Sequence, residues 1–128
     1  MSELTKQQIK NIEQKLGKYL PEDVVARYLE SNGFRGPTEC QFLYTFESEK
    51  ETDIVRVNEL IHNEDWFPVE LESLLLIGDD GCGSFIAFDT NKKAAVLWHP
   101  EDGTEIQETK NTVSEMWEYV EGLYDNEA

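Results

Sequence analysis

Two aspartates and three glycines gather in Gly78–Ser84, the stretch whose residue types most invite a chemical role. Glycine-rich turns present backbone N–H groups to anions. This stretch, however, lacks the Gly-Lys-Ser/Thr of a phosphate-binding loop, and Asp79 and Asp80 would repel a phosphate. Calcium takes roughly six to eight oxygen ligands, and these aspartates with Asp89 do not follow the ligand order of an EF-hand. The stretch therefore favours a structural hairpin, with a loop that contacts a partner as the alternative.

The residue types that attack substrates or ligate transition metals are scarce. They are His62, His99, Cys40 and Cys82, which do not show the C-x2-C type of spacing found in structural zinc sites. Cys82 and His99 could be paired as nucleophile and base, but such catalysis needs a third group that orients the base, and any chain with two of each offers a pair. Paired carboxylates carry no signal among 27 acidic residues. We therefore expect no enzymatic activity, no cofactor and no metal.

The charge of the chain is more informative about its partners. The 128 residues include 27 acidic and 11 basic ones, a net charge of −16, so we expect neither nucleic acid nor an anionic membrane as a direct partner. The acidic excess is densest in residues 101–128, which hold nine acids and one base. A hydrophobic fraction of 39% with 14 aromatic residues is enough for one folded domain over residues 1–128.

No stretch has the features of a targeting or membrane segment. The first ten residues, MSELTKQQIK, are polar and lack the apolar region of a signal peptide. The longest apolar run, Leu74–Ile77, is far shorter than the ~18 residues of a membrane span. We therefore expect a cytoplasmic protein in which Cys40 and Cys82 are free thiols rather than a disulfide.

Apolar residues with helical spacing predict two helices in the first part of the chain. Thr5 and Gln8 fit a capping box, and Gly17 ends the helix that begins there. Leu20–Asp23 opens a second helix, because proline suits a first turn and acids suit the positive end of the helix dipole, and Asn32–Gly33 ends it. The residues expected on the buried faces are Ile9, Ile12 and Leu16, then Val24, Val25, Tyr28 and Leu29.

Strand patterns dominate the rest of the chain until its last third. Leu74–Ile77, Ser84–Asp89 and Ala94–Trp98 are joined by short turns, which predicts an antiparallel meander. Before this meander we expect strands at Gln41–Phe46 and Ile54–Val57 and a short helical turn at Glu59–Asn63. After it we expect a short strand around Glu105–Glu108 and a helix that follows a capping box at Thr112 and Glu115. The residues on one face of that helix are Val113, Met116, Trp117, Val120 and Tyr124. The expected fold class is α+β, in the order α-α-β-β-β-β-(β)-α.

Four patterns follow one another along nearly the whole chain. They are the first helix with Gly17 and then at once Leu20–Asp23; the second helix ending in Asn32–Gly33; Leu76–Ile86 continued by Phe88–Asp89; and Val96–His99 with Glu101 and a closing helix around Val113–Leu123. In this order they resemble the SUKH superfamily, the Smi/Knr-type domain. No pattern is recognised in Cys40–Asn63, and Val24 and Val25 stand where the superfamily often has an aromatic residue.

This resemblance implies an α+β domain in which helices pack on a curved antiparallel sheet, and a protein without enzymatic activity. Many bacterial members look like immunity proteins, which bind and neutralise a toxin, and many of those toxins are nucleases or nucleic-acid deaminases. An acidic domain would complement the basic groove with which a nuclease holds its substrate. We therefore expect a basic toxin domain encoded nearby as the partner, and a monomer or weak dimer. The alternative is an intracellular scaffold or regulator without a toxin partner, since eukaryotic members are regulators that act through protein contacts.

The residues expected to contact the partner lie in loops and at strand ends. Trp98 would be the anchor, because tryptophan is enriched at binding hot spots, although a core tryptophan at a strand end fits equally well. The acids would contact a basic partner, and a solvated surface kept for solubility is the alternative for each of them. The candidates are Asp79, Asp80, Trp98, His99, Glu101 and Asp102, with Trp66 in its loop as a further one.

Overall fold

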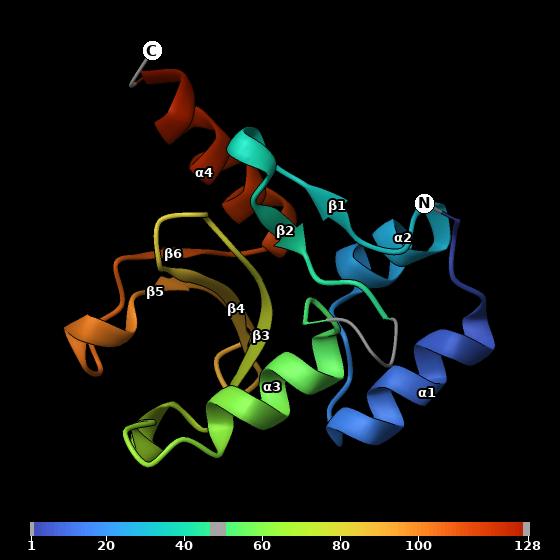
Figure 1. The fold of residues 1–128 in the computed structure, drawn as a ribbon, viewed down its shortest axis with the longest axis horizontal. Coiled ribbons are helices and arrows are strands. Elements are labelled where there is room, and N and C mark those ends of the chain that lie inside the picture. Colours follow the sequence, from blue (N-terminus) through green and yellow to red (C-terminus); the bar gives the residue numbers. More distant parts are fainter. Residues whose placement is uncertain (1, 47–50, 127–128) are drawn as a thin grey trace.

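The computed structural model describes residues 2–46 and 51–126 of the chain. The described helices are α1 (Lys6–Leu16), α2 (Glu22–Glu30), α3 (Ile54–His62) and α4 (Val113–Asn126). The strands are β1 (Phe34–Arg35), β2 (Gln41–Leu43), β3 (Leu74–Asp79), β4 (Phe85–Asp89), β5 (Ala94–Trp98) and β6 (Glu108–Lys110), and the short 3-10 helices are η1 (Pro37–Glu39), η2 (Val69–Leu71) and η3 (Pro100–Asp102) (Figure 1). The predicted α+β class is confirmed.

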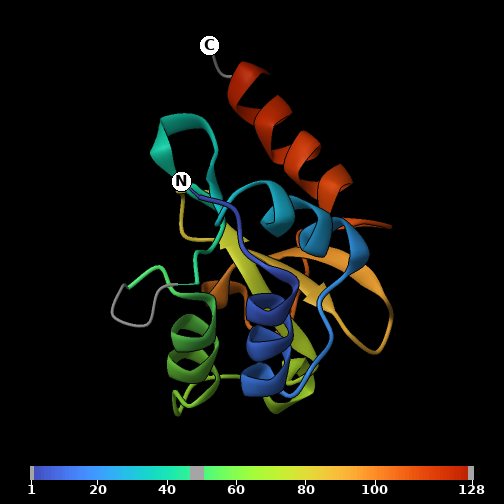
Figure 2. The same ribbon diagram turned by 90° about the vertical axis from the view of Figure 1, so that its right-hand side faces the viewer.

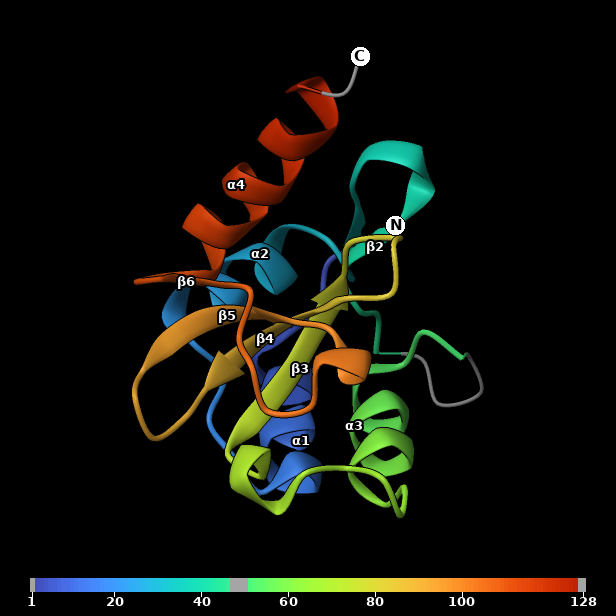
Figure 3. The same ribbon diagram turned by 90° about the vertical axis from the view of Figure 1, so that its left-hand side faces the viewer.

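The strands form two antiparallel sheets. The larger has the order β3-β4-β5-β6, which confirms the predicted meander, and β1 pairs with β2 in the smaller one. Figure 2 shows α1 and α3 side by side below α2 and α4. In Figure 3 the four-stranded sheet lies in front of α1 and α2, and α4 rises from the end of β6. The helices therefore pack around one side of the larger sheet.

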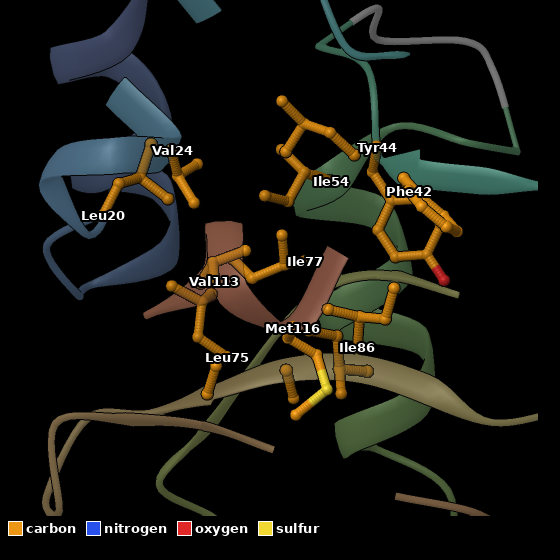
Figure 4. Close-up of a cluster of buried hydrophobic side chains, with 14 of the residues drawn as sticks. Leu20, Val24, Phe42, Tyr44, Ile54, Leu75, Ile77, Ile86, Val113 and Met116 are labelled. Atoms are coloured by element: carbon orange, nitrogen blue, oxygen red, sulfur yellow. The ribbon is translucent and has the colours of Figure 1, made fainter. Parts of the chain in front are cut away.

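The core lies between these helices and the sheet (Figure 4). Its side chains come from the helices, from β2 and from the inner face of the larger sheet. Those labelled in Figure 4 are Leu20, Val24, Phe42, Tyr44, Ile54, Leu75, Ile77, Ile86, Val113 and Met116, all of them buried. Within the described residues, no helix combines the length and the apolar character required to cross a membrane.

The local signals at the first helix are confirmed in atomic detail. The Thr5 hydroxyl accepts the Gln8 N–H at 3.1 Å, and the Gln8 side chain accepts the Thr5 N–H at 2.8 Å. Gly17 ends α1 with a φ of 69°, a left-handed conformation that glycine adopts without strain. In α2 the predicted buried face is correct for Val24 and Tyr28. It is wrong for Leu29, which is 39% exposed.

The centre of the chain differs most from expectation. Ile54–Val57 does not form a strand but the first turn of α3, which continues through the expected helical turn. The Asp53 carboxylate caps this helix by accepting the Arg56 N–H at 3.0 Å. Burial of Ile54, Val55 and Asn58 on one face outweighs the strand preference of β-branched residues, because propensity yields to tertiary packing.

Three smaller differences concern strand boundaries. The strand expected at Gln41–Phe46 ends at Leu43 and pairs with β1, which was not predicted. The strand expected around Glu105–Glu108 begins at Glu108, because its register is set by pairing with β5. In the expected order, α3 replaces the strand at Ile54–Val57 and β1 is added, while the other elements keep their sequence.

The outer edge of β3 is closed by α3 and by the segment that contains β2. The buried Asn58 side chain donates to the carbonyl oxygens of Ile54 at 2.8 Å and Leu76 at 2.9 Å, and accepts the Leu76 N–H at 2.8 Å. The Tyr44 N–H donates to the Ile77 carbonyl at 2.9 Å. These bonds pair backbone groups that an edge strand would otherwise leave open.

Candidate functional site

The loop that joins β3 to β4 follows Asp79, the last residue of β3, and both Asp79 and Asp80 bind the backbone of this loop. The Asp80 carboxylate accepts the N–H groups of Cys82 at 2.8 Å and Ser84 at 3.0 Å, and the Asp79 carboxylate accepts the Gly81 N–H at 3.1 Å. Gly81 and Gly83 have φ values of 78° and 98°, which favour glycine. The prediction of a structural hairpin is therefore confirmed.

The Asp79 carboxylate is half-buried and lies next to the Tyr44 hydroxyl. Burial raises the pKa of its carboxyl above the ordinary 3.8, although N–H groups and the Tyr44 hydroxyl, which donates to it at 3.3 Å, oppose that rise. Burial also raises the pKa of the Tyr44 hydroxyl, and the nearby Asp79 charge adds to that effect. A half-buried carboxylate thus stands beside a buried phenol at the end of β3.

The raised pKa of Asp79 predicts how stability depends on pH. An acid whose pKa is raised by folding weakens the folded state while it is ionised, and this penalty disappears as the pH falls below its ordinary value of 3.8. We therefore expect Asp79→Asn to melt at a higher temperature than the wild type at about pH 7, with the difference shrinking toward about pH 4. Thermal melts across this range, with Asp102→Asn as a control that removes the same charge from an exposed position, measure the effect. A lower melting temperature than the control at neutral pH would contradict it.

The C-terminal part of α4 rests on this loop. The Tyr124 hydroxyl donates to the Asp80 carbonyl and lies 3.4 Å from the Cys82 sulfur. Its hydrogen bond with Cys82 is the main cause that raises the pKa of Tyr124 to about 12. Cys40 is buried and Cys82 is exposed, and both are free thiols, as predicted. The tyrosine therefore fixes the loop against α4.

The turn after β5 lies next to the same loop. His99 accepts the Glu101 N–H with its Nδ1 atom at 3.1 Å, which makes it the cap of η3. A Cβ atom on Gly83 would stand 2.8 Å from the His99 Nε2 atom, so loop and turn are in direct contact. Glu101 and Asp102 are exposed on this turn. The contact between Gly83 and His99 thus joins the loop after Asp79 and Asp80 to the turn that carries Glu101 and Asp102.

Trp98 does not have the exposure that was expected of an anchor. It is 0% exposed, its indole N–H donates to the Gly103 carbonyl at 2.8 Å, and its ring lies between those of Phe67 and Phe85, with centroids 5.5 and 5.8 Å away. The expectation of a surface anchor is therefore wrong for Trp98, and the alternative of a core tryptophan holds. Burial of its large ring against these neighbours places it in the core.

Trp66 is the exposed aromatic residue of this region. Its side chain is 50% exposed, and its ring centroid lies 6.4 Å from that of Phe67, which in turn contacts Trp98. The row of rings connects Trp66 to the turn that carries Glu101 and Asp102. We call these six residues the acidic rim: Asp79, Asp80, His99, Glu101, Asp102 and Trp66.

A second surface feature, which sequence reasoning missed, is a groove between α2 and α4. It has a volume of about 430 Å³ and a floor of three aromatic rings, Phe34, Phe42 and Trp117. Its carboxylates come from both helices and are Asp23, Glu30, Glu118 and Glu121, and its one guanidinium is that of Arg27. One wall of the groove could be anticipated from the sequence, because Glu118 and Glu121 are spaced to lie beside the apolar face of α4. The opposite wall comes from residues some ninety positions earlier, so the sequence does not show that the two walls meet.

Asp23 holds the two walls of this groove together. Its carboxylate accepts the Val24 N–H at 3.0 Å in α2 and the Ser114 N–H at 2.7 Å in α4. One carboxylate therefore occupies the positive ends of two helices, which both favour a negative charge. On the floor, the Trp117 indole N–H donates to the Phe42 carbonyl at 2.7 Å. These bonds fix the distance between α2, α4 and β2.

No cluster of three or more His, Cys, Asp or Glu side chains suited to a metal ion occurs within residues 2–46 and 51–126. The surfaces described above offer carboxylates, one exposed tryptophan and an aromatic-floored groove. Aromatic side chains are enriched at protein interfaces, and carboxylates there complement basic partners.

The fold and these surfaces define an α+β domain built of a four-stranded meander, a small second sheet and packed helices. The chain belongs to the SMI1 / KNR4 family (SUKH-1), whose family model matches residues 3–118. The resemblance to the SUKH superfamily is therefore confirmed, and the match runs through Cys40–Asn63, where no motif was recognised. None of the curated proteins matches this chain.

Proposed function

We propose that this protein is a non-enzymatic immunity protein that binds a toxin domain and neutralises it. The observation that carries the proposal is membership of the SMI1 / KNR4 family (SUKH-1), since the resemblance to that superfamily implies toxin-neutralising members in bacteria. The net charge of −16 supports a basic partner, such as a toxin domain that itself holds nucleic acid.

The acidic rim is the contact surface that this proposal assigns first. Glu101 and Asp102 are exposed on η3, and Trp66 offers an exposed ring that is linked to this turn through Phe67 and Trp98. Asp79 and Asp80 also belong to the rim, but their carboxylates bind the loop's own backbone. The partner would then meet a rigid acidic turn with an aromatic side chain at its border.

The test uses the toxin domain encoded beside this gene as the probe. We expect the two proteins to purify together and the present protein to protect cells that produce the toxin domain. Glu101→Lys with Asp102→Lys is expected to weaken binding, whereas Glu59→Lys with Glu64→Lys, the same charge change on and beside α3, is the matched control.

Each result decides between specific alternatives. Absence of both binding and protection by the wild type would contradict the immunity function and favour a scaffold or regulator without a toxin partner. Equal binding by the rim variant and its control, with protection intact, would contradict the rim as the contact surface while the function stands.

A further inference from the structure

The groove between α2 and α4 differs from the rest of the acidic surface because its floor is aromatic. Phe34 stands edge-on to Trp117, with ring centroids 4.7 Å apart, and edge-on to Phe42 at 5.9 Å. Carboxylates border this floor on both walls. Aromatic faces attract cations, and carboxylates pair with them, so the two kinds of group favour the same type of side chain.

The chain already places one guanidinium in this groove. Arg27 lies over the Phe34 ring with its central carbon 3.9 Å from the ring centroid, and its contact with Glu30 is long, at 3.8 Å. Its Nε atom is buried and has no hydrogen-bond partner within the described part of the chain. Arg27 thus shows that the floor accepts an arginine, and that this arginine leaves the carboxylates of α4 unused.

Glu118 and Glu121 are those unused carboxylates. Both are exposed on α4, and within residues 2–46 and 51–126 neither lies within 4.0 Å of a cationic group. Asp23, in contrast, is engaged with backbone N–H groups of α2 and α4. The groove as a whole holds four carboxylates against one guanidinium, so its α4 wall keeps an uncompensated negative charge.

We propose that this groove is a docking site for an arginine or lysine side chain of the protein partner. Phe42 and Trp117 are buried and Arg27 covers Phe34, so the basic side chain enters beside Arg27 at the α4 wall and pairs with Glu118 and Glu121. The partner is therefore a protein with a basic segment rather than a small anion or a nucleic acid. The inference rests on the proposed function and names a second contact for the same partner.

One face of α4 links the groove to the loop that carries Asp80. Trp117, Glu121 and Tyr124 follow one another at helical spacing, so they share one face of the helix. Trp117 belongs to the groove floor, and Tyr124 rests on the loop that carries Asp80. A partner that covers the Asp80 loop therefore meets α4 on the face that leads to the groove.

A peptide of alternating arginine and alanine residues is the probe for this site, with the same peptide built with glutamate as its control. In two-dimensional NMR at low ionic strength we expect the arginine peptide to shift the amides of Arg27 and Phe34 and the indole N–H of Trp117. Glu118→Lys with Glu121→Lys is expected to weaken the arginine peptide about tenfold, because two charge-assisted contacts are lost and reversed.

The matched control is again Glu59→Lys with Glu64→Lys, which changes the net charge equally and is expected to weaken the peptide by less than about twofold. Glu118→Gln with Glu121→Gln removes the two charges without reversing them. This variant replaces the lysine variant in the test if the lysine variant has a lower melting temperature than the wild type. Equal weakening by the groove variant and the control, or shifts confined to residues outside the groove, would overturn the proposal.

The same variants separate this inference from the proposed function. If the wild type protects cells from the neighbouring toxin and Glu118→Lys with Glu121→Lys protects equally well, the groove is not the docking site and the function stands. If the wild type neither binds nor protects, the proposed function fails, whatever the peptide does. If the groove variant loses protection while the wild type and the control variant keep it, both the docking site and the proposed function are supported.

Discussion

Asn58→Ala is expected to lower the free energy of unfolding by about 3 kcal/mol or more, although the residue touches neither candidate surface. Its side chain makes three hydrogen bonds in a buried position, two of them with the backbone of Leu76 in the edge strand β3. Alanine would leave the Leu76 N–H and carbonyl buried without that partner, and each such group costs about 1–3 kcal/mol.

Urea unfolding of the wild type and of Asn58→Ala measures this loss. Asn63→Ala is the matched control, because Asn63 is exposed at the end of the same helix and its replacement should change stability by no more than about 0.5 kcal/mol. Asn58→Asp keeps an acceptor for the Leu76 N–H but removes both donors, so it should also be destabilised. A loss below about 1 kcal/mol for Asn58→Ala would mean that water replaces the side chain.

Gly78→Ala is the second substitution with a large expected effect, again about 3 kcal/mol or a failure to fold. A Cβ atom at Gly78 would lie 2.1 Å from the carbonyl oxygen of Phe42 and 2.6 Å from that of Gln41. Both obstacles are backbone atoms of β2, so no side-chain rotation relieves the clash. Because the Phe42 carbonyl also accepts the Trp117 indole N–H, displacement of β2 would disturb the groove floor as well.

The control for Gly78→Ala is the same substitution at Gly122 in α4. Nothing lies within 4 Å of a Cβ atom there, and alanine stabilises a helix interior by roughly 0.5–1 kcal/mol over glycine. We therefore expect opposite signs for the two variants in thermal or urea unfolding. A Gly78→Ala protein that unfolds at the wild-type urea concentration would show that β2 can move away at little cost.

Sequence reasoning succeeded where the cause of structure is local. The capping box of Thr5 and Gln8, the left-handed Gly17 and the tight turn after β3 depend on neighbours within a few residues, and all three are present. It failed for Ile54–Val57, whose composition favours a strand while the Asp53 cap and the partners of Asn58 favour a helix. Those partners lie on β3, so no window around the segment contains them.

The candidate surfaces likewise include features that nearby residues determine and features that depend on distant residues. The loop at Asp79 and the turn at Glu101 could be placed at strand ends from the sequence, and their contact through Gly83 and His99 follows from the meander. Trp98 could not be assigned to core or surface, because that choice depends on Phe67, thirty-one positions earlier. The groove was missed for the same reason, since its walls come from opposite ends of the chain.

The bond between Asp23 and the Ser114 N–H joins positions 91 residues apart and has a consequence for the order of folding. The chain loses the entropy of the long loop between these positions before their contact can form, so the contact is slower to form than one between near neighbours. Neither α2 nor α4 can build the groove by folding locally, and the groove exists only once this long-range contact has closed.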